Sequence, residues 1–527
     1  MPKNFLEKQS VSLTLLSPIH IGCGEDYEPT NFVADEKKLL LYYFDPSTVP
    51  LTDGERKRLG ELARGKSIRE IYKFYDAHFQ LYSSYAANFV RFDRSTQKKI
   101  EKLKTGDFGV GNKSKNRIEI PRTMYSVLNG RILPYIPGST MKGAIHTAYL
   151  DRLAETYTGQ FSTNDKLDEQ LLKGKMDKSP LKLICLSDFM KRNTSYSGTR
   201  IISRINVSKL TPPLLSAKGI PSAAEVMLPG EYRAFSGELV LKEPNGRDGV
   251  DTSVAYQAIS NIFKDLNRFN LAQFKRQIDY WSKGSDYTKR WLSSVDNLLT
   301  ALEPRLKNGT AALVRIGMNT GAQNFTIRVP GVARISSNKN GRRTVVGEPS
   351  SLTLALFDTA DFQGAVPFGW AILEMDSNVS EALEKWCIEN SKLFPSNQKE
   401  VREELNRLKG QVIEKQKEKV EEEAQQRRLV EERAKKEEEE QRKLAEMPET
   451  LRRLSEIVTK IERVSKVPPG SPLYKEVFEL LAEAENWEVR EQREAAAQIG
   501  RFFKTKGLDA GKDKNVMKAR LRKLRGE

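Results

Sequence analysis

A highly charged stretch from Glu400 to Glu446 constrains the fold of this chain more than any other part of its sequence. It contains 15 glutamates and 13 lysines or arginines, so its charges nearly balance and its apolar residues are sparse. Opposite charges three or four residues apart stabilise a solvated helix. A coiled coil is the competing interpretation, but its apolar seam would be incomplete. We therefore predict a long charged helix or linker over residues 377–446.

The region before this stretch carries the periodicities of both strands and helices. Apolar and polar residues alternate from Val11 to Leu15, which predicts a half-buried strand. A second strand is predicted from Leu39 to Phe44. Apolar spacings of three and four predict helical structure from Asp53 to about Phe92 and from Val254 to Leu302. Further strands are predicted around 181–187, 225–241, 311–316 and 369–375.

The segment Ile132–His146 is the most distinctive of the chain, with the sequence ILPYIPGSTMKGAIH. A short apolar strand is predicted to end at Pro137. The hydroxyl of Ser139 or Thr140 is then predicted to cap a helix.

The start of this helix has the composition of an anion site. Free amides, the positive end of the helix dipole and Lys142 would attract a phosphate. Lys142 and His146 are four residues apart and therefore share a face. Gly138 and Gly143 would let a backbone or a phosphate approach closely.

Basic segments elsewhere have two competing interpretations, a solvated surface or an RNA contact. They are predicted loops at 102–117 and 336–343, a basic ribbon at 200–206, and the C-terminal residues 501–527. The last of these has ten lysines or arginines against three acids.

The net charge of the whole chain, +17 over 527 residues, points first to a polyanion partner such as nucleic acid. A merely soluble basic protein is the alternative. The three cysteines, Cys23, Cys185 and Cys387, form no CxxC pair, so no disulfide framework or zinc cluster is predicted. A reducing, cytoplasmic location is expected.

Several other classes of protein are disfavoured. HExxH and GxxxxGK[ST] motifs are absent, and we predict neither a metal nor a cofactor. No apolar run approaches the roughly 18 residues of a membrane span. The first ten residues show no apolar core of a secretory signal.

Three motifs in order, SPIHIGCG, YIPGSTMKGAIHTAYL and VRIGMNTGAQNFT, resemble the RAMP superfamily of CRISPR proteins. The opening motif, followed by Tyr27-Glu-Pro, Asn31-Phe-Val-x-Asp35 and Tyr43-Phe-Asp45-Pro46, looks most like the fifth Csm subunit, which caps the guide 3′ end in type III-A effector complexes. The likeness spans roughly residues 8–376. One departure is His146, at a position that is commonly arginine in these motifs.

The resemblance implies an α+β fold of ferredoxin-like (RRM-like) βαββαβ units. We expect a RAMP region at 1–376, with two such units and a helical insertion near 53–92. The charged helix at 377–446 and a small basic all-α module at 447–527 would follow, and neither has a counterpart in the family pattern.

The resemblance also implies a non-catalytic subunit of a type III effector complex that binds crRNA and caps its 3′ end. Its other expected partners are the neighbouring RAMP backbone subunit and other type III subunits, with target RNA nearby. By analogy the glycine-rich helix start touches the guide and the loop from Gly317 supports the same surface. The predicted RNA-binding residues are Gly138, Ser139, Thr140, Lys142, Gly143, His146, Arg200, Arg204, Arg315, Gly317, Asn319, Thr320 and Gly321, and Arg328, Arg334, Arg342 and Arg343 rank lower.

Two alternatives remain open. A metal-independent endoribonuclease would need a general base, and His20, in a glycine-flanked turn, is the candidate. Its structural interpretation is a histidine bonded to backbone at a strand end. Alternatively, the C-terminal tail would make the protein an adaptor that recruits a nuclease or a small subunit.

Overall fold

A computed structural model describes most of the chain, which divides into two compact units, Met1–Ile413 and Glu414–Glu527. The described residues are 6–51, 53–65, 67–105, 118–128, 131–158, 164–173, 176–194, 198–208, 221–244, 249–282, 286–328, 335–339, 342–346, 349, 351–357, 364–377, 379–391 and 398–527. The predicted basic loop at 102–117 lies mostly outside them, as does Arg334.

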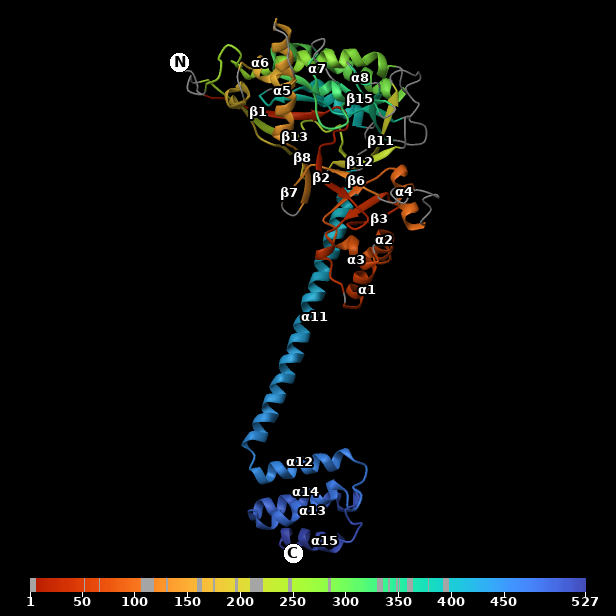
Figure 1. The fold of residues 1–527 in the computed structure, drawn as a ribbon, viewed down its shortest axis with the longest axis vertical. Coiled ribbons are helices and arrows are strands. Elements are labelled where there is room, and N and C mark those ends of the chain that lie inside the picture. The colour runs from red at the N-terminus through yellow and green to blue at the C-terminus, as the bar shows by residue number, and fades with distance from the viewer. Residues whose placement is uncertain are drawn as a thin grey trace. The chain divides into compact units, whose positions relative to one another are not determined.

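An eight-stranded sheet forms the centre of the first unit (Figure 1). Its strands run in the order β14-β19-β1-β13-β10-β8-β7, with β9 paired to β13. Because β1 pairs antiparallel with both β13 and β19, the N-terminal strand is a central one. The bounds are β1 Leu6–Leu15, β7 Tyr125–Leu128, β8 Arg131–Ile136, β9 Ile184–Leu186, β10 Phe189–Lys191, β13 Phe235–Lys242, β14 Ala311–Arg315 and β19 Trp370–Met375.

Strands β14 and β19 serve two hydrophobic cores, one on each face. Ala312 and Leu373 join a core with α5 (Gly138–Glu155) and α7 (Ile259–Trp281). Leu313 and Ile372 join a second core with α8 (Asp286–Ala301) and α10 (Glu381–Asn390). Successive residues of a strand point to opposite faces, so the near-continuous apolar sequence of these strands follows from burial on both sides.

The strand predicted from Val11 to Leu15 is confirmed, but its half-buried character is wrong. Ser12 and Thr14 are fully buried, because their hydroxyls have partners inside the protein. Arg192 Nη2 donates to Ser12 Oγ at 2.7 Å, and the amide of Arg233 donates to Thr14 Oγ1 at 2.9 Å.

A seven-stranded sheet forms the second layer of the first unit, in the order β18-β17-β11-β5-β4-β3, with β12 paired to β11. Helices α1, α2 and α3 lie beside its β3 end, and the aromatic rings of Tyr42, Phe44 and Tyr82 pack between them (Figure 1). The bounds are β3 Phe32–Asp35, β4 Leu40–Tyr43, β5 Asn88–Arg91, β11 Thr199–Ser208, β12 Ser222–Met227, β17 Ser351–Leu356, β18 Ala365–Pro367, α1 Asp53–Arg64, α2 Ile68–Ala77 and α3 Phe79–Ser84.

Two sequence predictions of local structure are corrected. The helical pattern predicted to about Phe92 ends at Ser84, because residues 88–91 form β5 and pair with β4. The loop predicted at 336–343 is a hairpin of β15 (Ile335–Lys339) and β16 (Arg342–Val346), so the side chains of Arg342 and Arg343, which lie outside the described part of the structure, stem from a strand.

Smaller elements complete the first unit. The pair β2 (Gly22–Tyr27) and β6 (Ile120–Thr123) forms a two-stranded sheet. The remaining helices are α4 (Arg94–Thr105), α6 (Asn164–Leu171) and α9 (Glu303–Asn308). Short 3-10 turns occupy Pro46–Thr48, Met176–Lys178, Pro180–Leu183 and Ala322–Phe325.

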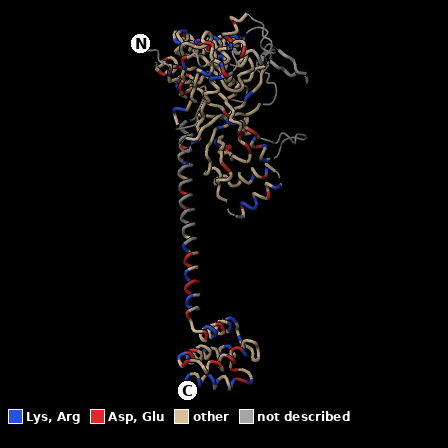
Figure 2. Tube along the Cα trace, turned by 60° about the vertical axis from the view of Figure 1, so that its left-hand side comes forward, with Lys and Arg blue, Asp and Glu red and all other residues tan. Residues whose placement is uncertain are grey.

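The predicted long charged helix is confirmed as α11, Gln398–Glu446. Figure 2 shows acidic and basic positions alternating along the coloured part of this helix. Those from Arg428 to Lys443 are exposed, and Lys443 pairs with Glu439 at 2.7 Å. Between Arg428 and Lys443, where every side chain is described and exposed, opposite charges one turn apart therefore stabilise a helix without a buried apolar face.

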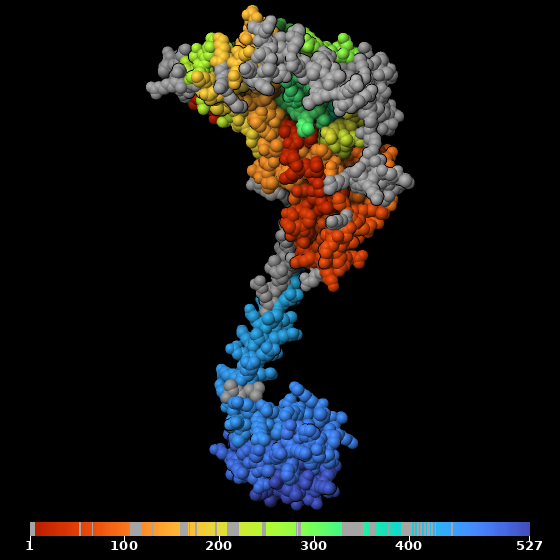
Figure 3. Space-filling model, viewed as in Figure 1, coloured from red at the N-terminus to blue at the C-terminus, as the bar shows by residue number. Residues whose placement is uncertain are grey.

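The second unit contains a bundle of four helices with its own core. Leu454, Ile461, Val477, Ile499 and Leu521 are among its buried side chains. Figure 3 shows these helices packed into one body. The bounds are α12 Glu449–Arg463, α13 Pro472–Glu483, α14 Val489–Thr505 and α15 Lys514–Arg525, with a 3-10 turn at Ala484–Asn486. The predicted α+β class with a C-terminal helical module is confirmed, and the division at 376 and 446 stays a prediction.

Candidate nucleic-acid interface

Two motif segments almost 300 residues apart lie side by side in the first unit. The amide of Met318 donates to the carbonyl of His20 at 2.8 Å, and the amide of Gly369 donates to the carbonyl of Pro18 at 2.9 Å. Gly317 has φ +86°, and a Cβ there would lie 2.7 Å from the His20 carbonyl oxygen. The sequence needs glycine at 317 because the two backbones touch.

The loop that follows β14 is held from within. Thr320 is buried and its hydroxyl donates to the carbonyl of Gly317 at 3.0 Å, while Asn324 Nδ2 donates to the carbonyl of Arg315 at 2.9 Å. Thr320 therefore shapes the loop and does not present its hydroxyl to a ligand. Gly321, with φ +86°, and Asn319, with φ +66°, complete the turn.

His20 is 1% exposed and has a backbone partner. Its Nδ1 lies 2.7 Å from the carbonyl oxygen of Glu225. Burial lowers the pKa of His20, and the nearby positive charge of Arg204 lowers it further. The backbone contact and the burial are those that the structural interpretation of His20 expects.

Arg204 lies next to this junction as a half-buried cation with neutral partners. Its Nε donates to Ser222 Oγ at 2.7 Å, and its Nη1 is 3.5 Å from Asn319 Oδ1. Burial lowers the pKa of Arg204 from its usual value. Both of these partners are neutral, so they do not compensate the positive charge of Arg204.

Lys99, on α4, lies close enough to Arg204 for their charges to interact, and the two form a cationic patch. The sequence did not indicate Lys99 as a candidate. Its Nζ donates to the carbonyl of Pro221 at 2.9 Å. Burial lowers the pKa of Lys99, and the charge of Arg204 contributes to the shift. The two cations come from segments 105 residues apart, and only the pairing of β11 in the second sheet brings them together.

Arg200 stands four residues before Arg204 on β11, where alternate residues share a face. It is partly exposed, and its charge acts on the phenol of Tyr287. The predicted basic ribbon is therefore a strand that carries both arginines.

The start of α5 differs from the predicted anion site. Pro137 occupies the N-cap position, so capping by Ser139 or Thr140 is wrong. The amide of Gly138 donates to Asp188 Oδ1 at 2.8 Å, so a carboxylate of the chain itself occupies this helix end.

The two glycines of α5 have different roles. A Cβ on Gly138 would lie 2.7 Å from the carbonyl oxygens of Leu186 and Ser187, so the close approach there is made by the chain's own backbone. A Cβ on Gly143 would meet nothing within 4 Å, and this glycine is exposed. Gly143 thus leaves a gap on the helix surface that no described residue fills.

Lys142, Ser139 and His146 complete the accessible part of the helix start. Lys142 Nζ donates to the carbonyl of Ile184 at 2.9 Å, which holds the ammonium beside the helix without neutralising it. Ser139 is exposed and His146 is half-buried. Met141 and Ile145, on the opposite side of α5, share a core with Ile19, Ile21 and Ile316, so the helix start, the turn and the glycine loop rest on one core.

The side chains of two other predicted arginines are engaged within the protein. Arg315 is 3% exposed, and its guanidinium donates to the carbonyl of Phe368 at 3.0 Å and to Gln277 Oε1 at 3.0 Å. Burial lowers the pKa of Arg315 to about 9. Arg328 pairs with the buried carboxylate of Asp151. Neither side chain presents a free charge to a phosphate.

Exposed apolar side chains on the glycine loop were also missed. Met318 is 52% exposed and Phe325 is 62% exposed. Bases of single-stranded RNA stack on such side chains. For Met318 the sequence signal was present, since it lies between two turn glycines, Gly317 and Gly321.

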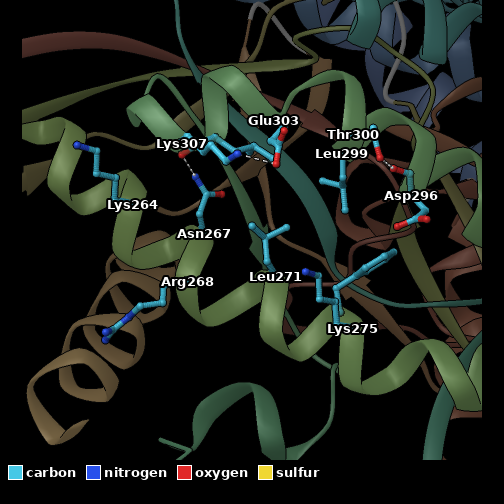
Figure 4. Close-up of a pocket in the computed structure, with 12 residues that line it drawn as sticks. Lys264, Asn267, Arg268, Leu271, Lys275, Asp296, Leu299, Thr300, Glu303 and Lys307 are labelled. Carbon is cyan, nitrogen blue, oxygen red and sulfur yellow. Dashed lines mark hydrogen bonds and ion pairs between the residues drawn. The ribbon is translucent and has the colours of Figure 1, made fainter. Parts of the chain in front are cut away.

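A separate groove of about 470 Å³ lies between α7, α8 and α9 (Figure 4). Its basic residues face acids: Lys307 pairs with Glu303 at 2.8 Å, and Asp296 also lines the groove. Arg268, at its edge, pairs with Glu155 at 2.6 Å. The groove is of mixed charge, unlike the patch around Arg204.

No cluster of three or more metal-ligating side chains occurs among the residues that the structure describes. Cys23, Cys185 and Cys387 are free thiols in this structure. None of the described helices is long and apolar enough to span a bilayer.

A family model described as the RAMP superfamily matches residues 12–458. No curated protein matches the chain. Among solved structures, a chain of a Csm–crRNA–target RNA ternary complex of a type III-A CRISPR-Cas system is 17% identical, with coverage of 70% of this chain and 100% of that one and a TM-score of 0.43. The crystal structure of T. onnurineus Csm5 is 16% identical, with coverage of 69% and 100% and a TM-score of 0.40.

Proposed function

The chain belongs to the RAMP superfamily, and on that premise we propose that it is a crRNA-binding subunit of a type III CRISPR effector complex. In this role it caps the 3′ end of the guide and contacts the neighbouring backbone subunit. One observation carries the proposal: the turn at His20, the glycine loop and Arg204, which are remote in sequence, meet at one surface.

The chemistry of this surface suits an RNA strand held without base reading. Arg204 and Lys99 are cations with neutral partners, and Lys142 is bonded only to a carbonyl. Phosphates and 2′-hydroxyls are gripped by such groups independently of sequence. Exposed Met318 and Phe325 offer apolar faces to a terminal base.

We propose that the subunit is not itself a nuclease. His20, the candidate base, is 1% exposed, and its Nδ1 is engaged by the Glu225 carbonyl at 2.7 Å, so burial and this contact argue against its use as a base. Incubation of the purified chain with labelled RNA, with and without divalent metal, tests this. Cleavage that is lost in His20→Ala would refute a purely binding role.

Charge reversal tests RNA retention. Lys142→Glu and the double variant Arg200→Glu/Arg204→Glu should each lower the guide RNA recovered per chain when the protein is purified with its operon neighbours. Lys264→Glu is the matched control, because Lys264 is an exposed helical lysine of α7 outside the proposed surface. Equal recovery from all variants would contradict the proposed surface.

A photo-crosslinking residue tests the capping role. Placed at the exposed position of Met318, it should react with nucleotides at the 3′ end of the guide in assembled complexes. Crosslinks confined to the 5′ end or the middle of the guide would overturn the capping role and leave RNA binding intact.

A further inference from the structure

The second unit contains a basic pocket that the proposed function does not use. It lies between the C-terminal half of α14 and α15 and has a volume of about 790 Å³. Two acids, Asp509 and Glu527, also line it. The cations that line it are Arg501, Lys504, Lys514, Lys518, Arg522 and Arg525.

Most of these cations have no ionic partner, although the unit is rich in acids. Other cations of the unit are paired: Arg453 with Glu483 at 2.5 Å, and Lys460 with Glu476 at 2.7 Å. Around the pocket only Arg501 has an ion pair in the described part of the chain, with Glu462 at 2.5 Å. Among the described residues, the cations of this pocket other than Arg501 thus lack the ion pairs that Arg453 and Lys460 have.

The positive charges are arranged on a rigid support. Lys514, Lys518 and Arg522 recur every four residues of α15, so they form a stripe with a rise of about 6 Å between neighbours. That interval is comparable with the separation of successive phosphates in a nucleic-acid strand. Met517 and Leu521, on the other side of α15, are buried in the core and fix the orientation of the stripe.

The wall of the pocket that α14 forms has a glycine, Gly500, where Arg525 of α15 approaches it. Gly500 of α14 has no side chain, and a Cβ there would clash with Arg525 Nη2. The guanidinium of Arg525 therefore lies against α14 at Gly500, where both residues line the pocket. Cations from two helices thus converge on one concave surface.

We propose that this pocket binds the phosphodiester backbone of single-stranded RNA, as a second RNA contact of the chain separate from the surface around Arg204. An acidic protein is the less suitable ligand, because protein interfaces are depleted of charge at their centres and rich in exposed aromatic and Met anchors. The apolar residues that line the pocket, Phe503 and Leu521, are half-buried and buried. Binding by cations alone is independent of base sequence and strongly dependent on salt.

Charge reversal in the full chain tests the proposal. The pocket variant is Lys504→Glu/Lys514→Glu/Lys518→Glu. The control variant, Lys475→Glu/Arg490→Glu/Arg493→Glu, makes the same change of net charge at exposed residues of the same bundle that do not line the pocket. All six side chains are exposed, so circular dichroism should show unchanged helicity in both variants.

The probe is a fluorescein-labelled oligouridine of about 20 nucleotides, and its dissociation constant is measured by anisotropy over a range of salt concentrations. Loss of three phosphate contacts should lower the slope of log K against log salt by about 2, with at least a tenfold loss of affinity at low salt. The control variant should stay within about twofold of the parent chain.

The same measurements in an Arg200→Glu/Arg204→Glu background keep the two RNA contacts apart. The loss caused by the pocket variant should persist there, whatever becomes of the proposed guide site. If the pocket and control variants lost RNA affinity equally, the loss would be explained by the change of net charge alone, and the proposal would be overturned. Unchanged RNA affinity, with loss of an effector subunit from purified complexes, would overturn it in favour of a protein partner.

Discussion

Gly143 offers a test in which stability and RNA binding change in opposite directions. The residue lies within α5, where glycine is less favourable than alanine by about 0.5–1 kcal/mol. A Cβ at this position meets nothing within 4 Å. Gly143→Ala should therefore stabilise the first unit by that amount, which is about 1 °C in the midpoint of thermal unfolding for a unit of this size.

If the guide backbone approaches the helix at Gly143, the same methyl group intrudes between protein and RNA. We expect guide recovery or RNA affinity to fall about tenfold, which corresponds to roughly 1.4 kcal/mol. Calorimetry of the purified chain gives the stability change, and anisotropy with a guide-length RNA gives the affinity. A variant that is stabilised and binds RNA like the parent would show that the RNA does not touch this part of α5.

Gly138→Ala is the contrasting variant one turn earlier. Its Cβ would lie 2.7 Å from two backbone carbonyl oxygens, which cannot move aside like a side-chain tip. Overpacking of this kind destabilises by about 1–3 kcal/mol. A stability gain in Gly138→Ala would refute the geometry from which both predictions derive.

Three further predictions concern stability. Arg328→Ala leaves the buried carboxylate of Asp151 without its cation and should lower the free energy of unfolding by about 3 kcal/mol in urea titrations; a loss under 1 kcal/mol would contradict this. Because burial lowers the pKa of His20 below 6.5, the unfolded chain binds more protons, so this contribution to stability is complete above pH 6.5 and declines as the pH falls below it. The unfolding midpoint of His20→Gln should decline less than that of the parent between pH 7.5 and 5, and parallel curves would be the adverse result. Truncation ahead of Glu404 removes its 2.7 Å hydrogen bond from Tyr42 Oη and should destabilise the first unit by about 1 kcal/mol relative to truncation at the boundary between the two units.

The sequence predicted those elements whose periodicity is long and regular. The helices of 254–302, the charged helix and the strand at Val11 all appear where expected. The strand β5 was missed because it has only four residues and directly follows a helical pattern, so its alternation is too short to be recognised. The burial of Ser12 could not be predicted, because its partner Arg192 is 180 residues away.

The candidate site shows the same limit. The apolar run AALVRI around Arg315 is typical of a strand buried on both faces. The burial of the Arg315 guanidinium could therefore have been predicted from the sequence. Lys99 had no such signal, because an isolated lysine of an amphipathic helix looks like any solvated charge. Its relation to Arg204 arises only when β11 and α4 pack together.

Asp188 changes how the start of α5 can hold RNA. A phosphate at the Gly138 amide would have to displace the Asp188 carboxylate, which already accepts the hydrogen bond of this amide. The positive end of the helix dipole therefore interacts with Asp188. RNA would instead contact Lys142, the exposed hydroxyl of Ser139 and the open space at Gly143. Asp188→Ala separates the two possibilities. It should destabilise the first unit by about 1 kcal/mol, as loss of a cap does, and leave RNA affinity within about twofold. A marked gain in affinity would show that the amide itself is a phosphate site that Asp188 holds closed.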